Sequence, residues 1–564
     1  MSDNLYDKLS QERKELQAEG LIPEWYTTAG WQMFKSKYLY GTDRSVRGQF
    51  ERIAKTAAKH VPTLCDAENQ FFELLWKGWL SPSTPVLANM GTDRGMPVSC
   101  SGTVVTDSID GFYSNLHEIA MLTKNGFGTA SDLSHIRPRG AKISVGGKAS
   151  GVLPVIKEHV NAMRNVAQGT ARRGAWAAYL DIEHGDFYEV VNFLMSEPDD
   201  FNIGWTIKQS FIDRLNAGDE DAISRFQKAM KAKMILGKGY FFFVDKANEK
   251  RPVMYKDKGL MINNSQLCSE IMLFNDDKHT YTCVLSSMNA AKYDEWKNTD
   301  AVYWATVFLD CVASEFIEKA KGIPGLEKAV RFTEKGRALG LGLCGLHTLF
   351  MQKMIPFESF DAHMLSQEIQ GYIWDQSQKA TKELALILGE PEWCKGYGVR
   401  NTHLIAIAPT KSTALIMGGV SEGINPDPAM SYVQATAAGE VDRLNPILLE
   451  LMKSKGVYTR KHVQEITDKQ GSVQHVDWLT EKEKAVFKTA FEINQKAVIR
   501  MASARSRYID QWQSLNLFFA ADEDPAWIAE VHKEAFEDPN ILALYYIYTQ
   551  AGVQASKGEC EACM

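Results

Sequence analysis

Short apolar runs alternate with amphipathic stretches from about residue 96 to residue 435, with Gly-rich turns between them. Short apolar runs bounded by turns are typical of buried strands, and amphipathic stretches between strands are typical of helices that cover a sheet. A chain that alternates in this way is restricted to an α/β layer or an α/β barrel. We therefore predict an α/β domain over residues 96–435.

The segments on either side of this domain follow a helical pattern. Residues 1–95 carry helical periodicity until Ser81-Pro-Ser-Thr-Pro85 interrupts it, because proline cannot continue a helix. Residues 436–552 are mainly helical in pattern, and residues 553–564 are small and polar, as in a mobile tail. We predict an N-terminal helical domain, the α/β domain, a helical C-terminal region and this tail.

The composition excludes several classes of protein. A length of 564 residues with 45% apolar and 24% charged residues fits a soluble globular protein with a large core. The net charge of -7 argues against a nucleic-acid surface, although backbone amides can still bind small anions. We find no signal peptide and no membrane span. The nine cysteines are typical of reduced thiols in the cytoplasm.

One stretch, Asn264-Ser-Gln-Leu-Cys-Ser-Glu270, carries an amide, a thiol and a carboxylate. Alternate side chains of an extended segment share a face, so we expect Gln266, Cys268 and Glu270 to point the same way. The return segment 279–285 brings Cys283. If the two pieces converge, two thiols and a carboxylate share one small volume. Cysteine also serves as an apolar core residue, whereas an ionised glutamate is rarely buried without a partner or a function.

Three further cysteines stand out. By itself, Cys100 in Val98-Ser-Cys-Ser-Gly102 is typical of a core thiol at the start of a strand. Cys560 and Cys563 form a Cys-x-x-Cys pair on the tail. Such a pair can exchange disulfides, and a structural zinc site would need a second pair of ligands that we do not find nearby. We predict a redox-active tail and no metal site.

Four other motifs each have an ordinary structural interpretation. Pro409-Thr-Lys-Ser-Thr413 precedes an apolar run, as in an anion cradle or a simple helix cap. The basic loop 168–174 is typical of a solvated connector, and Tyr545-Tyr546 is typical of core packing. The run Gly340-Leu-Gly-Leu-Cys-Gly345 matches a dinucleotide-binding pattern but follows a charged stretch instead of a clear strand.

Taken in order along the chain, these motifs resemble the large catalytic (alpha) subunit of class I ribonucleotide reductase. The resemblance covers about residue 80 to the last residue and rests on Ser81-Pro-Ser-Thr-Pro85, Val98-Ser-Cys100, Leu267-Cys-Ser-Glu270, Thr282-Cys283, Arg400-Asn401, Pro409-Thr-Lys-Ser-Thr413, Tyr545-Tyr546 and the cysteine tail. It implies a ten-stranded α/β barrel with the Cys268 segment as a central finger loop. It also implies the reduction of ribonucleoside diphosphates to deoxyribonucleotides.

The resemblance implies a role for each catalytic residue. A transient thiyl radical on Cys268 would abstract the 3′ hydrogen of the substrate, since the S–H and C–H bonds are comparable in strength. Glu270 would act as general base on the 3′ hydroxyl. Cys100 and Cys283 would supply a proton and two electrons as the 2′ hydroxyl leaves as water, and would end as a disulfide. Gln266 stands where the family usually has Asn, so we expect a shifted amide contact with the substrate.

The resemblance also implies partners. Cys560 and Cys563 would reduce the disulfide and be recharged by a thioredoxin- or glutaredoxin-like protein. Tyr546 and then Tyr545 would relay an electron and a proton from a radical-bearing small (beta) subunit, which would hold the metal or radical cofactor, so that this chain binds no permanent cofactor. The residues that would hold the ribose and phosphates of the substrate are Ser83, Thr84, Thr410, Lys411, Ser412 and Thr413.

Regulation carries over in part. Asp107 and Arg137 match positions that bind dNTP or ATP effectors at a homodimer interface, and the loop with Gln168 and Arg172 matches the one that links the effector to base choice. The chain starts almost directly with the helical domain, which leaves no room for an N-terminal ATP-cone. We therefore expect that dATP does not switch this subunit off through a cone.

Two alternatives remain open on the sequence. A cobalamin-dependent ribonucleotide reductase would need no partner subunit and no tyrosine relay, and the Tyr545-Tyr546 pair favours class I over it. A non-catalytic nucleotide-binding or disulfide-carrier protein would leave the ordered set of thiols unexplained. We expect a location in the cytoplasm, or in the host cytoplasm if the chain is viral.

Overall fold

The computed structural model describes residues 3–41, 43, 45–144, 146–168, 172–199, 201–436 and 439–550. Its helices are α1 (Asp3–Ala18), α2 (Thr28–Lys37), α3 (Val46–Ala58), α4 (Ala67–Trp76), α5 (Thr84–Asn89), α6 (Ile109–Lys124), α7 (Val152–Asn165), α8 (Phe187–Ser196), α9 (Gln209–Asn216), α10 (Glu220–Leu236), α11 (Val244–Lys250), α12 (Val253–Asp257), α13 (Tyr293–Trp296), α14 (Ala301–Ala320), α15 (Glu327–Gly336), α16 (Leu346–Gln352), α17 (Phe360–Leu388), α18 (Lys411–Ile416), α19 (Pro446–Ser454), α20 (Arg460–Asp468), α21 (Glu481–Val486), α22 (Gln495–Arg505) and α23 (Pro525–Glu537). Its strands are β1 (Leu80–Pro82), β2 (Cys100–Val104), β3 (Gly128–Asp132), β4 (Ala167–Gln168), β5 (Arg172–Arg173), β6 (Trp176–Asp181), β7 (Asn202–Ile207), β8 (Tyr240–Phe243), β9 (Tyr281–Thr282), β10 (Leu285–Asn289), β11 (Gly340–Cys344), β12 (Ser431–Thr436), β13 (Gly439–Leu444), β14 (Leu517–Phe519), β15 (Ala543–Leu544) and β16 (Ile547–Thr549).

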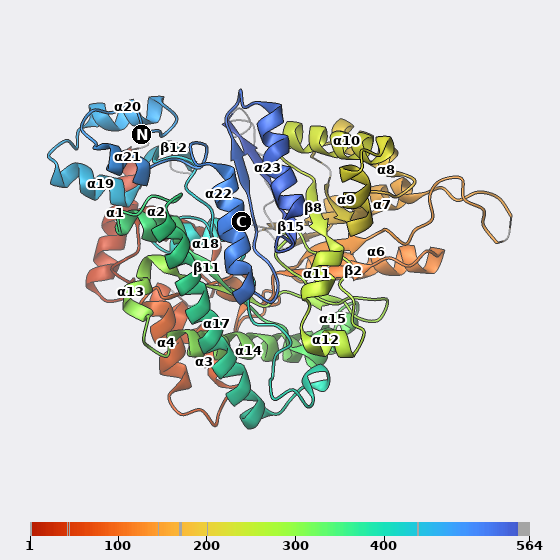
Figure 1. Cartoon of the computed structure of the whole chain (residues 1–564). Coiled ribbons are helices and arrows are strands. Elements are labelled where there is room, and N and C mark those ends of the chain that lie inside the picture. Colours follow the sequence, from red (N-terminus) through yellow and green to blue (C-terminus); the bar gives the residue numbers. More distant parts are fainter. Residues whose placement is uncertain are drawn as a thin grey trace.

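Two sheets form the centre of the molecule. The larger has the order β15-β8-β7-β6-β3-β2-β9, in which β2, β3, β6, β7 and β8 are parallel and the two edge strands are antiparallel. The smaller has the order β1-β10-β11. Strands β3, β6, β7 and β8 are buried along their whole length, as expected of parallel strands covered on both faces. Figure 1 shows α8, α9 and α10 gathered beside β8.

Backbone hydrogen bonds continue the smaller sheet toward the larger one. Leu341 N–H of β11 donates to Leu404 O, and a parallel bridge links Ile407 to Gln513. Tyr545 N–H, directly after β15, donates to Leu515 O. On the other side the chain itself runs from β9 into β10. The sheets therefore curl around a common interior, which confirms the predicted α/β barrel.

The segment between α12 and β9 crosses this interior without regular secondary structure. Its residues 264–275 are all buried. A buried loop must satisfy its backbone polar groups, and the surrounding barrel does so. Tyr179 Oη donates to Gln266 O at 2.7 Å, Ser514 Oγ donates to Cys268 O at 2.6 Å, and Trp512 N–H donates to Glu270 O at 2.9 Å. This segment is the expected finger loop.

The glycines of the Gly340–Gly345 run serve close packing. Residues 340–344 form buried strand β11, so the run contains no strand-to-helix phosphate turn at its start. A Cβ on Gly340 would lie 2.4 Å from Leu285 Cδ2, and one on Gly342 would lie 2.7 Å from Ala406 O. Since real Cβ atoms do not approach other atoms this closely, only glycine allows the neighbouring segments to come together here.

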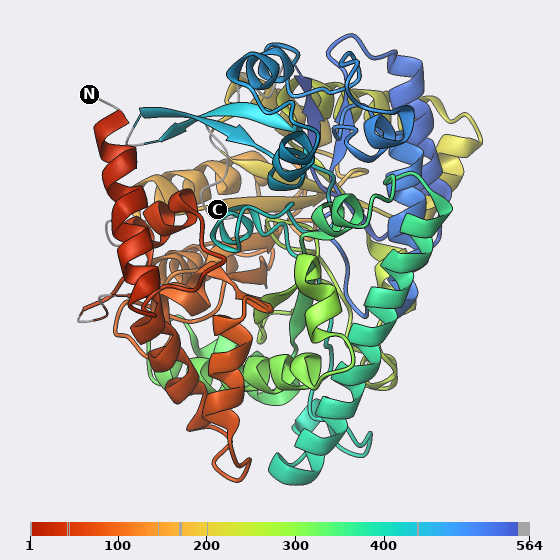
Figure 2. The ribbon, with the colours of Figure 1, turned by 90° about the vertical axis from the view of Figure 1, so that its left-hand side faces the viewer.

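Helices cover the barrel on opposite sides. Figure 2 shows the N-terminal helices along one side of the molecule and the long helix α17 along the other. Phe71 of α4 packs edge-on against Phe308 of α14 with ring centroids 5.4 Å apart, which joins the N-terminal helices to the central domain. Among the described residues, no helix is long and apolar enough to cross a membrane.

The segment 436–552 combines helices α19–α23 with strands β13–β16. Three of these strands are too short to show a strand pattern in the sequence, β14 and β16 with 3 residues each and β15 with 2, although β15 pairs with β8. The barrel thus draws on residues beyond 435. The domain boundaries at 95, 435 and 552 stay predictions.

Candidate active site

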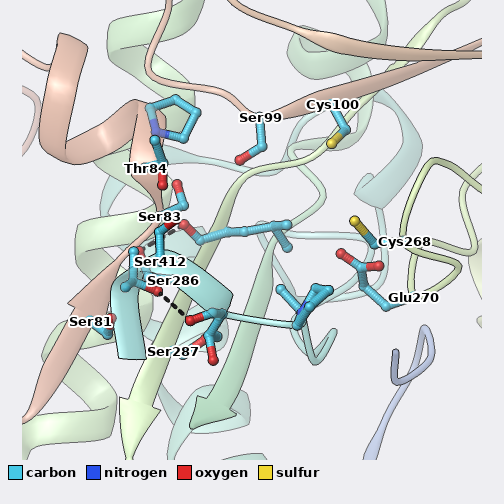
Figure 3. Close-up of a pocket in the computed structure, with 16 residues that line it drawn as sticks. Ser81, Ser83, Thr84, Ser99, Cys100, Cys268, Glu270, Ser286, Ser287 and Ser412 are labelled. Carbon is cyan, nitrogen blue, oxygen red and sulfur yellow. Dashed lines mark hydrogen bonds between the residues drawn. The ribbon is translucent and has the colours of Figure 1, made fainter. Parts of the chain in front are cut away.

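One pocket collects most of the side chains singled out in the sequence (Figure 3). Cys100, Cys268 and Glu270 lie at one end of it. The residues that line the pocket are Ser81, Ser83, Thr84, Pro85, Ser99, Cys100, Cys268, Glu270, Leu285, Ser286, Ser287, Ala408, Pro409, Thr410, Ser412 and Thr413. Residues more than 300 positions apart in the chain therefore meet around one cavity.

The finger loop makes a turn at the reactive thiol. Ser269 has a φ of 66°, and its N–H donates to Gln266 O at 3.3 Å. The prediction of an extended segment from 264 to 270 is therefore wrong. Cys268 and Glu270 nevertheless both face the pocket (Figure 3), because the left-handed residue between them redirects the chain. The Gln266 side chain does not line the pocket, but its amide lowers the pKa of the Glu270 carboxyl group.

Burial controls the charge of Glu270. The side chain is 1% exposed, and this desolvation raises the pKa of the carboxyl group to about 7. The nearby Gln266 amide and the hydrogen bond from the Ser514 hydroxyl act in the opposite direction and favour the ionised form. A carboxyl group with a pKa near 7 can both accept and release a proton at neutral pH.

Cys100 and Cys283 are cross-strand partners. In the antiparallel pair β2–β9, Ser101 lies opposite Thr282 and Gly102 opposite Tyr281, so the next pair along the register is Cys100 with Cys283. Cys283 N–H donates to Cys100 O at 3.0 Å. Burial raises the pKa of the Cys283 thiol well above its usual value, and the hydrogen bond with the Cys100 thiol adds to the shift. Both thiols are reduced, and opposed positions of this kind are close enough for a disulfide.

The other end of the pocket is rich in hydroxyl groups from the starts of two short helices. Ser83 precedes α5 and Thr410 precedes α18. Thr410 has a φ of 58°, and its Oγ1 accepts a hydrogen bond from Gly423 N–H at 2.8 Å. Thr84 Oγ1 lies 3.1 Å from Tyr38 Oη. Of the six predicted substrate-binding residues, five line the pocket, and Lys411 belongs to the same turn without lining it.

The rings of Tyr545 and Tyr546 lie in contact outside this pocket, with their planes tilted by 38°. Their ring centroids are 4.0 Å apart. Tyr545 is 2% exposed, whereas Tyr546 is half-buried. The extended segment 511–515 connects the pair to the finger loop, because Tyr545 N–H donates to Leu515 O while Trp512 N–H donates to Glu270 O.

The predicted effector residues are only partly described. Arg137 Nε lies 2.6 Å from Asp107 Oδ2, so these two side chains form an ion pair at the surface. Gln168 and Arg172 pair in the register of strands β4 and β5, which brings the two ends of the basic loop together. Cys560 and Cys563 lie outside the described residues.

Arg400 and Asn401 serve the scaffold. Arg400 Nε lies 3.0 Å from Asp310 Oδ2, and Arg337 Nε lies 2.8 Å from Asp310 Oδ1. The Asn401 amide donates to Asp310 Oδ1 at 2.9 Å. The two cations hold the pKa of the buried Asp310 carboxyl at about 2, against the opposing effect of burial. This motif therefore joins α14 and α15 to the segment after α17.

Sequence reasoning missed several pocket residues. Ser286 and Ser287 line the cavity from β10, and two adjacent hydroxyls in the apolar run after Cys283 were the available signal. Ser514 contacts the finger loop from a segment without a motif. Asn202 and Tyr240 adjoin the tyrosine pair, and nothing local marks them, since their roles depend on a contact across more than 300 residues.

Comparisons with known proteins agree with this arrangement. The family model described as ribonucleotide reductase, all-alpha domain, matches residues 24–95, and the one described as ribonucleotide reductase, barrel domain, matches residues 98–227, 219–393 and 391–547. The putative ribonucleoside-diphosphate reductase large subunit of Frog virus 3 is 33% identical over 520 residues, which cover 86% of this chain and 90% of the relative.

Two further relatives bear on the class of chemistry. The solved structure of the Actinobacillus ureae class Id ribonucleotide reductase alpha subunit has a TM-score of 0.87 and 35% identity, and the match covers 95% of this chain and 99% of that one. The vitamin B12-dependent ribonucleoside-diphosphate reductase of Thermoplasma acidophilum is 28% identical over 527 residues, which cover 87% of this chain and 66% of the relative.

Proposed function

Because the chain belongs to the ribonucleotide reductase large-subunit family, we propose that it reduces ribonucleoside diphosphates to 2′-deoxyribonucleoside diphosphates in the pocket around Cys268. The observation that carries the proposal is the common position of Cys100, Cys268 and Glu270 on one cavity wall, with Cys283 directly opposite Cys100. Two thiols from distant segments line one pocket, and the third faces one of them across the β2–β9 pair.

The residues take the following roles. A thiyl radical on Cys268 abstracts the 3′ hydrogen, and Glu270 accepts the proton of the 3′ hydroxyl. The 2′ hydroxyl leaves as water with a proton from the Cys100–Cys283 pair. Two electrons and the second proton from this pair reduce the sugar, and the two sulfurs are oxidised to a disulfide. Cys268 then returns the hydrogen atom to C3′ and regains its thiyl radical, while Glu270 returns the proton to the 3′ oxygen. The pKa of Glu270 near 7 supports the proton transfer, because a base with that pKa is poised at neutral pH.

The hydroxyl-rich end of the pocket holds the substrate. Ser83, Thr84, Thr410, Ser412 and Thr413 bind ribose and phosphate oxygens, with Lys411 supplying positive charge from the same turn. Hydroxyls and backbone N–H groups are suitable donors for phosphate. Gln266 holds the substrate indirectly, since its amide contacts Glu270 and so fixes the carboxylate that receives the 3′ hydroxyl proton.

The radical reaches Cys268 from a separate small subunit by way of Tyr546 and Tyr545. Their ring separation of 4.0 Å supports this route, and the small subunit carries the metal or radical cofactor.

A cobalamin-dependent reaction is the second candidate, since one relative is a vitamin B12-dependent enzyme. That reaction generates its radical without a partner subunit and has no use for a tyrosine pair.

Effector nucleotides bind near Asp107 and Arg137 at the interface of a homodimer. Two observations support this location. Asp107 lies next to Ser108, the N-cap of α6, and Ile109 and Tyr113, one helical turn apart on α6, are 71% and 60% exposed. Large apolar side chains exposed on one helix face mark a contact surface. Gln168 and Arg172 link the effector to base choice.

Cys560 and Cys563 reduce the active-site disulfide and exchange electrons with a thioredoxin or glutaredoxin.

The test is mass spectrometry of the thiols after a single turnover. With a ribonucleoside diphosphate and the radical-bearing small subunit, we expect a Cys100–Cys283 disulfide in proportion to the deoxynucleotide formed. Cys268→Ser should give neither product and retain the fold, because oxygen cannot form the radical at comparable energy. If the disulfide forms equally well without the small subunit, and only when adenosylcobalamin is added, the result would support the cobalamin candidate. Turnover by Cys268→Ser would refute the proposal.

A further inference from the structure

Asn202 is a polar residue in an otherwise apolar place. It begins β7, a strand whose residues are all buried, and is itself 7% exposed. Asparagine is depleted in strands, and a buried amide requires hydrogen-bond partners on both its oxygen and its nitrogen. The partners of Asn202 therefore explain why it stands there.

Backbone donors fix which way the Asn202 amide points. Its Oδ1 accepts hydrogen bonds from Ile203 N–H at 2.9 Å and from Gly239 N–H at 3.3 Å. Since both of these groups can only donate, the oxygen must face them and the Nδ2 group must face the opposite way. Nδ2 then donates to the hydroxyl oxygen of Tyr240 and, at 3.4 Å, to that of Tyr546.

Tyr240 is packed against both members of the tyrosine pair. Its ring centroid lies 5.1 Å from that of Tyr545 and 5.7 Å from that of Tyr546. Lys233 Nζ donates to the carbonyl oxygens of Tyr545 and Gly239, which fixes the backbone of the pair to the β8 side. The hydroxyl groups of Tyr240 and Tyr546 thus meet at one oriented amide, and the Tyr545 ring packs against both of their rings.

We propose that Asn202 is a positioning residue of the tyrosine relay, which orients the hydroxyl groups of Tyr546 and Tyr240 by donating N–H to both oxygens, and that Tyr240 completes the relay as its third ring. The proposal rests on the radical route described above. A phenol loses its proton as it loses an electron, so the direction of the O–H bond decides where the proton goes. An amide that donates to the phenol oxygen forces the hydroxyl hydrogen to point to another acceptor.

The contact can be tested in the isolated chain. We would replace Tyr546 by a trifluorotyrosine, whose phenolate absorbs in the ultraviolet, and titrate it with Asn202 intact, with Asn202→Asp and with Asn202→Leu. Asp keeps the oxygen that accepts from Ile203 and Gly239 but removes the N–H donor. Loss of a donor to the phenolate should raise the pKa of the probe by about 1 unit in Asn202→Leu and by more in Asn202→Asp.

The matched control is Asn69→Leu. Asn69 donates to Asp66 at the surface of the N-terminal helical region, so this variant should leave the probe unshifted. A probe pKa that is equal in the Asn202 variants and in the control would overturn the assignment of the amide contact. This result does not depend on turnover, so it is separate from any failure of the reductase proposal.

The role in the relay is tested in the complex with the small subunit. Both Asn202 variants should lower kcat about 10-fold and leave KM for the nucleotide unchanged, because the substrate pocket is untouched. Tyr240→Phe should also lower kcat, and an aminotyrosine at position 240 should trap a radical visible by paramagnetic resonance. Full kcat in the Asn202 variants, or a radical trapped at Tyr546 but never at 240, would overturn the proposal.

Discussion

Ser514 Oγ lies 2.9 Å from Glu270 Oε2, and the same hydroxyl lies 2.6 Å from the backbone carbonyl of Cys268. A serine hydroxyl has one hydrogen, so the two acceptors compete for it. The shorter contact is with the carbonyl. The contact with Glu270 favours the ionised carboxylate and so opposes part of the rise in pKa that burial causes. One hydroxyl group thus couples the position of the reactive thiol to the charge of the neighbouring carboxyl group.

Replacing Ser514 by alanine should shift the pH dependence of turnover. The hydroxyl helps to stabilise ionised Glu270, so its loss should move the acidic midpoint of kcat/KM upward by about 0.5 to 1 pH unit. The measurement is a pH–rate profile. Ser36→Ala, at the exposed end of α2, is the control and should leave the profile in place. A midpoint that is unchanged or moves to lower pH in Ser514→Ala would contradict this role.

Replacing Glu270 by glutamine should abolish turnover and change the pH dependence of stability. Burial raises the pKa of this carboxyl group from 4.5 to about 7 in the folded protein. A raised pKa contributes stability that is fully present below pH 4.5 and is lost as the pH rises to about 7. The loss amounts to roughly 3 kcal/mol at about 1.4 kcal/mol per pH unit. Glutamine does not titrate, so the variant should gain stability relative to the wild type over this range. Denaturation curves of the wild type and the variant at pH 4 and pH 8 give the difference in their free energies of unfolding. A difference that is the same at both pH values would contradict the prediction.

Replacing Gly102 by alanine should displace the Cys100–Cys283 pair. An added Cβ would lie 1.9 Å from Cζ of the buried Tyr281 ring. Overpacking of this kind costs roughly 1–3 kcal/mol. We expect a lower denaturation midpoint and slower disulfide formation, both partly restored by Tyr281→Leu in the same chain. Gly48→Ala is the control, because this helical position has room for a Cβ and alanine favours helix. Equal stability of the two alanine variants would show that Tyr281 does not press on β2.

Replacing Gln266 by asparagine tests the longer amide. The shorter side chain should withdraw the amide group that favours ionised Glu270. We therefore expect KM for the nucleotide to rise several-fold and the pH midpoint to move upward in the same direction as for Ser514→Ala. The double variant with Ser514→Ala should shift further than either single variant, since the two groups act on the same carboxyl group. An improved KM would indicate that the shorter amide contacts the substrate directly.

The sequence by itself determined the class of fold and the chemical inventory of the site. The alternation of apolar and amphipathic runs predicted an α/β layer or barrel, because burial on two faces leaves a local signature, and the family resemblance selected the barrel. The unusual residue types, a thiol beside a carboxylate and hydroxyls at a helix start, singled out Cys268, Glu270 and the 409–413 turn, and the family resemblance added Cys100. Of these, all but Lys411 line one pocket. These side chains could be recognised in the sequence because burying a polar or charged group without a partner costs free energy.

Only the tertiary structure decided how these groups are held and tuned. The left-handed turn at Ser269, the hydroxyl of Ser514 on Glu270, and the amide of Asn202 between Tyr240 and Tyr546 all depend on contacts that are remote in the chain or on one unusual backbone angle. Neither kind of feature leaves a periodic trace, because ordinary serine and asparagine residues gain these roles only from what the folded barrel places beside them.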